Sequence, residues 1–292
     1  MPRKIKLYMF TGSAPSMTAQ LMLEHKGLGH KRKHLMVGPH AFGMLGRGFQ
    51  TMTVPALKVD GRRVQGTRDI SRALDEIEAQ RPLFPADPQQ RAAVEQAERW
   101  GEDFQDLVRR LVLCACQRDP RAFSSVYRHA SAGMRPAQRM ARGLTIRLAS
   151  AGHQATDRNG QEGVAALPAR LDQIDRWIEV GILNGPELNA ADFQIAPNIS
   201  LLLCFADLAA LVQGRPAERL AARVVPQFPG EIGQVLPAAW LTEATTASPA
   251  GEGTYSELMG PGDVLRAIGY DDERISSALN QHATAGHFQA HG

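Results

Sequence analysis

The chain has 292 residues, of which 43% are apolar and 22% charged, so it is long enough for two domains and a sizeable core. Its net charge of +3 is unevenly spread, because residues 241–292 carry seven acidic groups against two arginines. Residues 1–240 carry 31 basic and 23 acidic groups. Their basic residues do not form a stripe interleaved with aromatic residues. We therefore expect no nucleic-acid partner.

The three cysteines, Cys114, Cys116 and Cys204, cannot all pair with one another. No apolar stretch follows the basic N-terminal residues, as a secretory signal would need, and no apolar run is long enough to cross a bilayer. We expect a protein of the reducing cytoplasm without a membrane partner. Cys114 and Cys116 lie too close together for a redox pair and are expected to be small core residues.

Local patterns in the first 80 residues predict a small mixed sheet with helices beside it. The expected elements are a strand over 5–10, a helix opening at Pro15, a strand over 35–37, a glycine-rich loop over 38–50 with at most one helical turn, a hairpin turning at Asp60-Gly61, and a helix over 67–79. The crossover between the first two strands makes a parallel pair, and the hairpin makes an antiparallel one. This order is typical of a thioredoxin-like domain.

A proline at the mouth of the hairpin is the centre of the expected site. Pro55 follows the β-branched Val54 and opens a short apolar run. Most such bonds are trans, but strand entrances are where cis bonds occur by design. With Ser13 before one helix and Thr67 opening another, we expect a cis bond. It would turn the backbone N–H and C=O of Val54 toward a peptide-like ligand.

Four pieces of this region, in order and spacing, resemble the N-terminal domain of glutathione S-transferases over nearly all of residues 4–88. They are Lys6-Leu7-Tyr8, Ser13 ahead of a helix ending in Leu23-Glu24-His25-Lys26-Gly27-Leu28, Val54-Pro55-Ala56-Leu57, and the segment from Thr67 to Glu76. The resemblance implies an α/β thioredoxin-like N-terminal domain followed by an all-α C-terminal domain.

The expected division is a thioredoxin-like thiol-binding domain over 1–80, a linker over 81–88, a helical domain over 89–240, and a flexible acidic tail over 241–292 with room for a short helix. Helical stretches are expected over 89–117, 121–132, 136–151, 161–180, 190–212 and 263–281. Two Pro-containing segments, 225–230 and 236–240, are expected to wrap back over the helices, as in Actinobacteria-like members of the family. Asn189 and Asp192 form a capping-box pattern with a role in folding.

The resemblance implies that Ser13 is the catalytic hydroxyl that stabilises a bound thiolate. A helix N-terminus and a hydroxyl donor both favour the anion of a thiol. The alternatives are that Ser13 is only an N-cap, or that Ser16 takes the catalytic role. Tyr8 lies within a strand and is expected to face the core.

The cofactor-binding residues that the resemblance implies are Val54, Pro55, Gly66 and Thr67. The Val54 backbone would pair with the cysteinyl amide of a thiol tripeptide, and Thr67 would hold its γ-glutamyl carboxylate. Family members usually carry Glu-Ser where this chain has Gly66-Thr67, so a partner for the γ-glutamyl ammonium is missing. The thiol is therefore glutathione or another low-molecular-weight thiol, such as mycothiol. Arg68 is expected to be a solvated helix charge.

His25, His30 and His34 are spaced like metal ligands, but the lysines and arginine among them would repel a cation. We expect a solvated basic loop there and no metal.

Two functions remain open from the sequence. The first is a cytoplasmic glutathione S-transferase-like enzyme, working as a homodimer in detoxification, which adds the thiol to an apolar electrophile. The second is a non-catalytic member of the fold that serves as a thiol-binding or protein-interaction module. Ser13 before Pro15 favours the enzyme, whereas Gly66 and the unshared tail favour the module.

Overall fold

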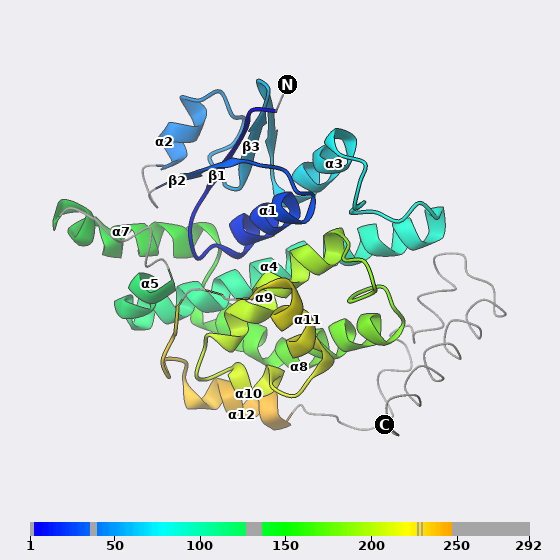
Figure 1. Ribbon diagram of the computed structural model, residues 1–292. Helices are drawn as coiled ribbons and strands as arrows, with labels where there is room; N and C mark the ends of the chain where they lie inside the picture. The colour runs from blue at the N-terminus through cyan, green and yellow to red at the C-terminus, as the bar shows by residue number, and fades with distance from the viewer. Residues whose placement is uncertain (1–2, 36–39, 127–135, 227, 229, 247–292) are drawn as a thin grey trace.

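The structure is a computed structural model that describes residues 3–35, 40–126, 136–226, 228 and 230–246. A small sheet with three helices forms one end of the molecule, and a group of helices forms the rest (Figure 1). The predicted fold class, a thioredoxin-like α/β part followed by helices, is confirmed.

The sheet has four strands in the order β2-β1-β3-β4. They are β1 (Ile5–Met9), β2 (Lys31–His34), β3 (Ala56–Val59) and β4 (Arg62–Gln65). Strand β1 runs parallel to β2 and antiparallel to β3, and β3 pairs with β4 as the predicted hairpin. At its turn Asp60 and Gly61 have φ of 47° and 100°, the two positive values that a type I′ turn needs.

The second strand lies earlier than the sequence predicts. Strand β2 covers Lys31–His34, whose four side chains are all exposed, rather than residues 35–37. The prediction followed the apolar run, but an edge strand can be formed by charged residues that keep other chains from pairing with it. The basic residues expected in a solvated loop are indeed exposed, but they form this strand and not a loop. Met36 and Val37 lie outside the described residues, and helix α2 (His40–Leu45) follows them.

Helices α1 (Ala14–His25) and α3 (Thr67–Ile77) pack against one face of the sheet through the main apolar core. The opposite face carries a smaller cluster made of Tyr8, Met44, Phe49 and Ala56. Tyr8 is buried, as predicted, with its ring edge-on to Phe49 at 5.4 Å between centroids.

The helical part is built around α9 (Ala190–Leu203), every residue of which is buried except Leu203. Its sequence is mostly apolar, as a helix in the interior requires, and it also buries four polar side chains, Asp192, Gln194, Asn198 and Ser200. The other helices of this part are α4 (Pro88–Arg118), α5 (Pro120–Val126), α7 (Pro136–Gly152), α8 (Asp157–Glu179), α10 (Ala209–Val212), α11 (Pro216–Val224) and α12 (Ala238–Thr246). The sequence reading missed α11 and ended the helical domain at residue 240, whereas α12 continues to Thr246. The last predicted helix, over 263–281, lies outside the described residues.

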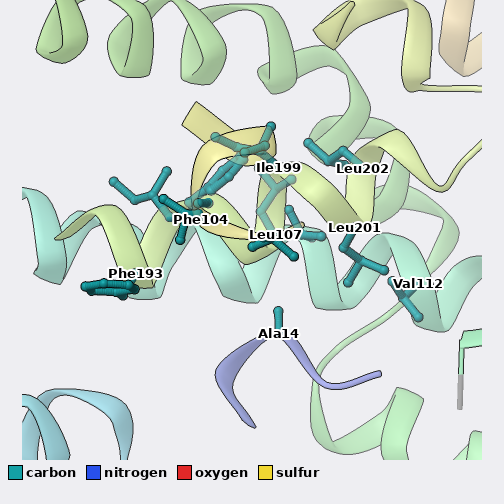
Figure 2. Packing of buried hydrophobic residues seen from close by; sticks show 14 of the residues in the cluster. Ala14, Phe104, Leu107, Val112, Phe193, Ile199, Leu201 and Leu202 are labelled. Carbon is teal, nitrogen blue, oxygen red and sulfur yellow. The ribbon is translucent and has the colours of Figure 1, made fainter. Parts of the chain in front are cut away.

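The two parts of the chain share one core, in which α1 packs against α9. In Figure 2 Ala14, at the start of α1, points toward Leu107 on α4. The Thr18 hydroxyl donates to the carbonyl oxygen of Phe193 over 2.8 Å, and the ring of His25 lies 5.1 Å from that of Phe193. The start of α1, where the predicted catalytic serine sits, is therefore anchored by the helical part.

A buried carboxylate joins α3 to α4. Glu98 is 1% exposed and accepts hydrogen bonds from the Ser71 hydroxyl at 2.7 Å and the Arg72 guanidinium at 2.5 Å. Burial raises its pKa, and the bonds from Ser71 and Arg72 oppose that rise. Arg68, expected to be solvated, also turns toward α4 and pairs with Glu102 at 3.3 Å.

Replacing Glu98 by alanine should destabilise the fold by about 3 kcal/mol, because it removes the buried carboxylate that pairs with Arg72 and accepts from Ser71 at a domain junction. Urea unfolding measures this loss. The control is Glu95→Ala, which removes a partly exposed carboxylate 4.0 Å from the same arginine and should cost under about 1 kcal/mol. Equal losses for the two variants would contradict the role of burial.

The capping box at the start of α9 is confirmed. The Asn189 side chain accepts from the backbone of Asp192, and the Asp192 carboxylate accepts from the N–H of Asn189 at 2.9 Å and of Asn184 at 2.7 Å. Asp192 is fully buried, and burial raises its pKa to about 6. Because the pKa of Asp192 is higher in the folded than in the unfolded state, the folded state binds the carboxyl proton more tightly. The resulting stability is complete below the unfolded pKa and is lost as the pH rises through about 6.

The variant Asp192→Asn removes this titration while keeping one acceptor. Between pH 4 and 7, the free energy of unfolding of the wild type relative to that variant should fall by on the order of 2 kcal/mol. Urea unfolding at several pH values measures the difference. A difference that stays flat or grows with pH would contradict the assignment.

Candidate functional site

The pairing of the strands brings the predicted site residues to one edge of the sheet. Strand β1 ends where β3 begins, because Tyr8 pairs with Ala56, and β4 ends at the same place, because Gln65 also pairs with Ala56. Ser13 follows β1, Val54-Pro55 precedes β3, and Gly66-Thr67 follows β4. Three segments that are far apart in the sequence therefore meet at this edge.

Ser13 is the N-cap of α1, with Pro15 in the first turn, as the sequence predicts. Its Oγ accepts a long and therefore weak hydrogen bond from the N–H of Ser16 at 3.5 Å. The Ser13 side chain is half-buried. The hydroxyl proton is not used in that bond and remains available to a ligand. Ser16 is fully buried, and its Oγ accepts from the N–H of Phe10 at 3.2 Å, so it holds the end of β1 in place.

The backbone of the turn before Ser13, at Gly12, packs closely against the last residue of α5, Val126. Gly12 has a φ of +85°, and a Cβ placed on it would lie 1.9 Å from the carbonyl oxygen of Val126. Only glycine allows this backbone-to-backbone approach. The position of Ser13 therefore depends on a contact with the helical part that no local sequence pattern reveals.

The bond between Val54 and Pro55 is cis, as expected. The Pro55 carbonyl accepts from the N–H of Gly66 at 3.1 Å, which ties the strand entrance to the start of α3. Within the described part of the chain, neither the N–H nor the C=O of Val54 has a hydrogen-bond partner. An extended peptide could use both groups.

Helix α3 opens without a side-chain cap. Its N-cap, Gly66, has φ 92° and ψ 149°, a conformation that is nearly restricted to glycine. Thr67 is the first helical residue and is 5% exposed. The uncapped N–H groups of the first turn and the helix dipole favour an anion at this position.

A polar pocket of about 720 Å³ lies beside Gly66, between α3, β4 and the loop over 48–53. Gln65 holds that loop in place, because its amide nitrogen donates to the carbonyls of Thr51 (2.9 Å) and Thr53 (2.7 Å). Its amide oxygen accepts from the N–H of Thr51 at 3.1 Å. The sequence reading missed this residue, since a glutamine at a strand end carries no signal of its own.

Asp69 also lines the pocket, one helical turn after Gly66. Its side chain is exposed and has neither an ion pair nor a hydrogen bond to another residue that the structure describes. The pocket also contains Arg63 and Arg72, so both signs of charge line its wall. Such a wall suits a zwitterionic ligand. Asp69 was missed by the sequence reading, which treated it as part of a helix pattern.

Burial disfavours the reactive thiolate form of all three cysteines. Cys114 and Cys116 are buried, as predicted, and burial raises the pKa of both, that of Cys116 to about 12. Burial also raises the pKa of Cys204, to about 11. Because the thiolate is the nucleophile, chemistry on sulfur at neutral pH would need a thiol brought by a ligand.

Metal and membrane features were also sought in the described residues. No group of three or more His, Cys, Asp or Glu side chains there is arranged to hold a metal ion. No helix in those same ranges combines the length and apolarity needed to cross a membrane.

Comparisons with known proteins agree on the class of fold. Residues 7–82 match the family model described as the glutathione S-transferase N-terminal domain. Three solved structures superpose with TM-scores of 0.50. FzlA from C. crescentus is 17% identical, with 82% of this chain and 99% of that one covered. A glutathione S-transferase from Sinorhizobium meliloti 1021 is 18% identical (82% and 98%), and NaGST-2 is 13% identical (85% and 98%). No curated protein matches the chain.

The architecture is thus a thioredoxin-like sheet packed on a helical part. The predicted resemblance of the N-terminal part to glutathione S-transferases is confirmed by the match of residues 7–82.

Proposed function

We propose that this protein is a glutathione S-transferase-like enzyme that adds a low-molecular-weight thiol, glutathione or a similar one, to an apolar electrophile. The observation that carries the proposal is the meeting of Ser13, the unpaired Val54 backbone and the uncapped start of α3 at one sheet edge. The family match of residues 7–82 supports it.

In this proposal Ser13 stabilises the thiolate. Its hydroxyl proton is donated to the ligand sulfur, and the N-terminus of α1 adds a favourable potential, so the pKa of the bound thiol falls. The thiol proton leaves to solvent. The sulfur then forms a bond to the electrophilic carbon, and that carbon either releases its leaving group or takes up a proton after addition.

The rest of the thiol peptide is bound by groups that have no partner in the described structure. The Val54 N–H and C=O pair with its cysteinyl unit, and Thr67 with the free N–H groups of α3 holds its terminal carboxylate. Asp69 takes the place of the glutamate that the family usually carries at the position of Gly66, and accepts from the ligand ammonium. The bond to Asp69 thus replaces the contact to the γ-glutamyl ammonium that Gly66 cannot make, and it makes glutathione a suitable ligand.

Asp69→Asn tests the ammonium contact. The variant should raise the KM for glutathione by about tenfold with kcat little changed, because the lost interaction is made equally in the ground and transition states. Steady-state kinetics measure both constants. The control is Glu76→Gln in the same pocket, whose carboxylate already pairs with Arg62 at 2.7 Å, and it should leave KM within about twofold. An unchanged KM in Asp69→Asn would remove this residue from the site.

We further propose a cytoplasmic location, a role in detoxification and a homodimeric state, all of which follow from the family resemblance. Light scattering on the purified chain tests the dimer, and a monomer at micromolar concentration would contradict it.

The proposed activity is tested by thermal shift and turnover with glutathione and with mycothiol, each against a chloroaromatic acceptor. We expect saturable turnover with at least one thiol. Saturable binding without turnover would instead support the non-catalytic thiol-binding module. Failure of both thiols to bind would overturn both readings.

A further inference from the structure

The face of the sheet opposite α1 and α3 carries a row of basic side chains. The register pairs Lys6 with Lys31 on one side and with Lys58 on the other, and Lys58 pairs with Arg63. Because paired positions share a face, these four residues, here called the basic row, cross all four strands. Their neighbours along the strands, such as Leu7 and Leu57, point into the main core on the other side.

Two more cations extend this surface. Lys33 lies two residues after Lys31 on β2, and the guanidinium carbon of Arg47 lies 5.8 Å from the centre of the Tyr8 ring. The remaining strand residues on this face are Tyr8, Ala56 and Gln65, so none of the strand positions on it is acidic. Within the described ranges, none of the six cations forms an ion pair. All are exposed except Lys58, which is half-buried.

The distribution of lysine singles out the same surface. Of the 33 basic side chains only six are lysines, all within residues 1–58: Lys4, Lys6, Lys26, Lys31, Lys33 and Lys58. The body of the chain uses arginine instead. Lys26 is a buried residue paired with Asp75, so four of the other five lysines lie on this one face.

Protection of a sheet edge explains only part of this pattern. Lysines on the edge strand β2 prevent pairing with other chains, which accounts for Lys31 and Lys33. Lys6 and Lys58 lie on the central strands β1 and β3, where like charges directly opposite each other are destabilising. An anionic occupant of the row would offset that repulsion.

The same chain contains a segment of matching charge. Residues 247–292 hold six acidic residues, three of them consecutive (Asp271, Asp272 and Glu273), against Arg266 and Arg274. The segment leaves α12 at Thr246, at the opposite end of the molecule from the sheet (Figure 1). A segment of this length can extend to roughly 150 Å, whereas a body of this size has a radius of gyration of about 18 Å. It can therefore reach the row.

We propose that the acidic C-terminal segment, residues 247–292, docks on the basic row of its own molecule. The complementary charges supply the attraction, and the covalent link supplies a high effective concentration. Single-stranded nucleic acid fits this face less well, because its one aromatic strand residue, Tyr8, is buried under Phe49 and offers no stacking surface. The proposal does not depend on the thiol chemistry proposed above.

Carbodiimide cross-linking of the full-length chain tests the contact. The reagent joins a lysine amine to a carboxylate as an amide, and the water lost is taken up by the carbodiimide as its urea. Mass spectrometry of the monomer should show links from the Asp271–Glu273 peptide to Lys6, Lys31, Lys33 and Lys58. Screening in 1 M salt should lower their yield by about fivefold.

A charge variant with a matched control makes the test specific. In Lys6→Gln/Lys58→Gln, links from the tail to the untouched Lys31 and Lys33 should fall by about fivefold, because the attraction of the whole row is weakened. The control, Arg121→Gln/Arg158→Gln, removes the same charge from side chains that are 92% and 86% exposed elsewhere and should leave the yield unchanged. Circular dichroism checks that each variant is folded.

A double-mutant cycle on the Tm gives a second readout. Neutralising Asp271, Asp272 and Glu273 should lower the Tm of the wild type but not that of the Lys6/Lys58 variant. The proposal is overturned if tail links fall no more in the Lys6/Lys58 variant than in the arginine control, or if isotope mixing shows that the links join two copies. It is also overturned if the tail stays unlinked while phosphatidylserine vesicles or single-stranded RNA bind through Lys6 and Lys58.

Discussion

Replacing Ser13 by alanine should lower kcat/KM for thiol transfer by about 100-fold, the typical cost of removing one hydrogen-bond donor aimed at a developing or bound anion. The affinity for glutathione should change little, since most of the contacts proposed for it lie at Val54, Thr67 and Asp69. Steady-state kinetics with a chloroaromatic acceptor, together with calorimetric titration of glutathione, measure the two effects separately.

The matched control is Thr11→Ala, in the same turn. The Thr11 hydroxyl is 2.8 Å from Nδ1 of His34 and is thus engaged with β2. Its loss should reduce kcat/KM by less than about fivefold. Undiminished turnover in Ser13→Ala would show that this serine is only a helix cap, while equal losses in both variants would point to a general disturbance of the turn.

Replacing Gly12 by alanine should destabilise the protein by about 3 kcal/mol or more, the largest stability effect that we expect from one methyl group. The new Cβ would meet the carbonyl oxygen of Val126 at 1.9 Å, and the positive φ of +85° adds strain. The oxygen belongs to the backbone, so no side-chain rotation relieves the contact. The turn and α5 must separate, which also displaces Ser13. Urea unfolding and the turnover assay measure the two consequences.

The control Gly27→Ala distinguishes the steric contact with Val126 from the backbone strain of a positive φ. Gly27 also has a positive φ, +64°, but a Cβ there meets nothing within 4 Å. Only the conformational cost remains, about 1 kcal/mol, and turnover should be retained. Similar losses for the two variants would show that the approach to Val126 is not what constrains the turn.

The elements that sequence predicts well are those with local signals. The Asp60-Gly61 hairpin follows from the φ preferences of two residues, and the Asn189–Asp192 box from side chains that satisfy the first turn of their own helix. The position of Ser13 before Pro15 follows from helix-start chemistry in the same way, whereas the cis bond before Pro55 is expected only when Ser13 and Thr67 are considered with it.

What could not be predicted depends on contacts between distant segments. Strand β2 is defined by its pairing with β1, and its exposed basic residues show no apolar alternation. The fit of Gly12 against Val126 joins residues that are over 100 positions apart. Gln65 and Asp69 line a common pocket only because β4, α3 and the loop over 48–53 come together in the fold.

The most direct test of the proposed site is the ionisation of the bound thiol. Ultraviolet difference absorption of the thiolate, followed as a function of pH at saturating glutathione, gives its pKa on the protein. The proposal predicts a value at least about one unit below that of a free thiol. In Ser13→Ala the value should return toward the free one. A bound thiol that ionises like the free molecule in the wild type would contradict the proposal.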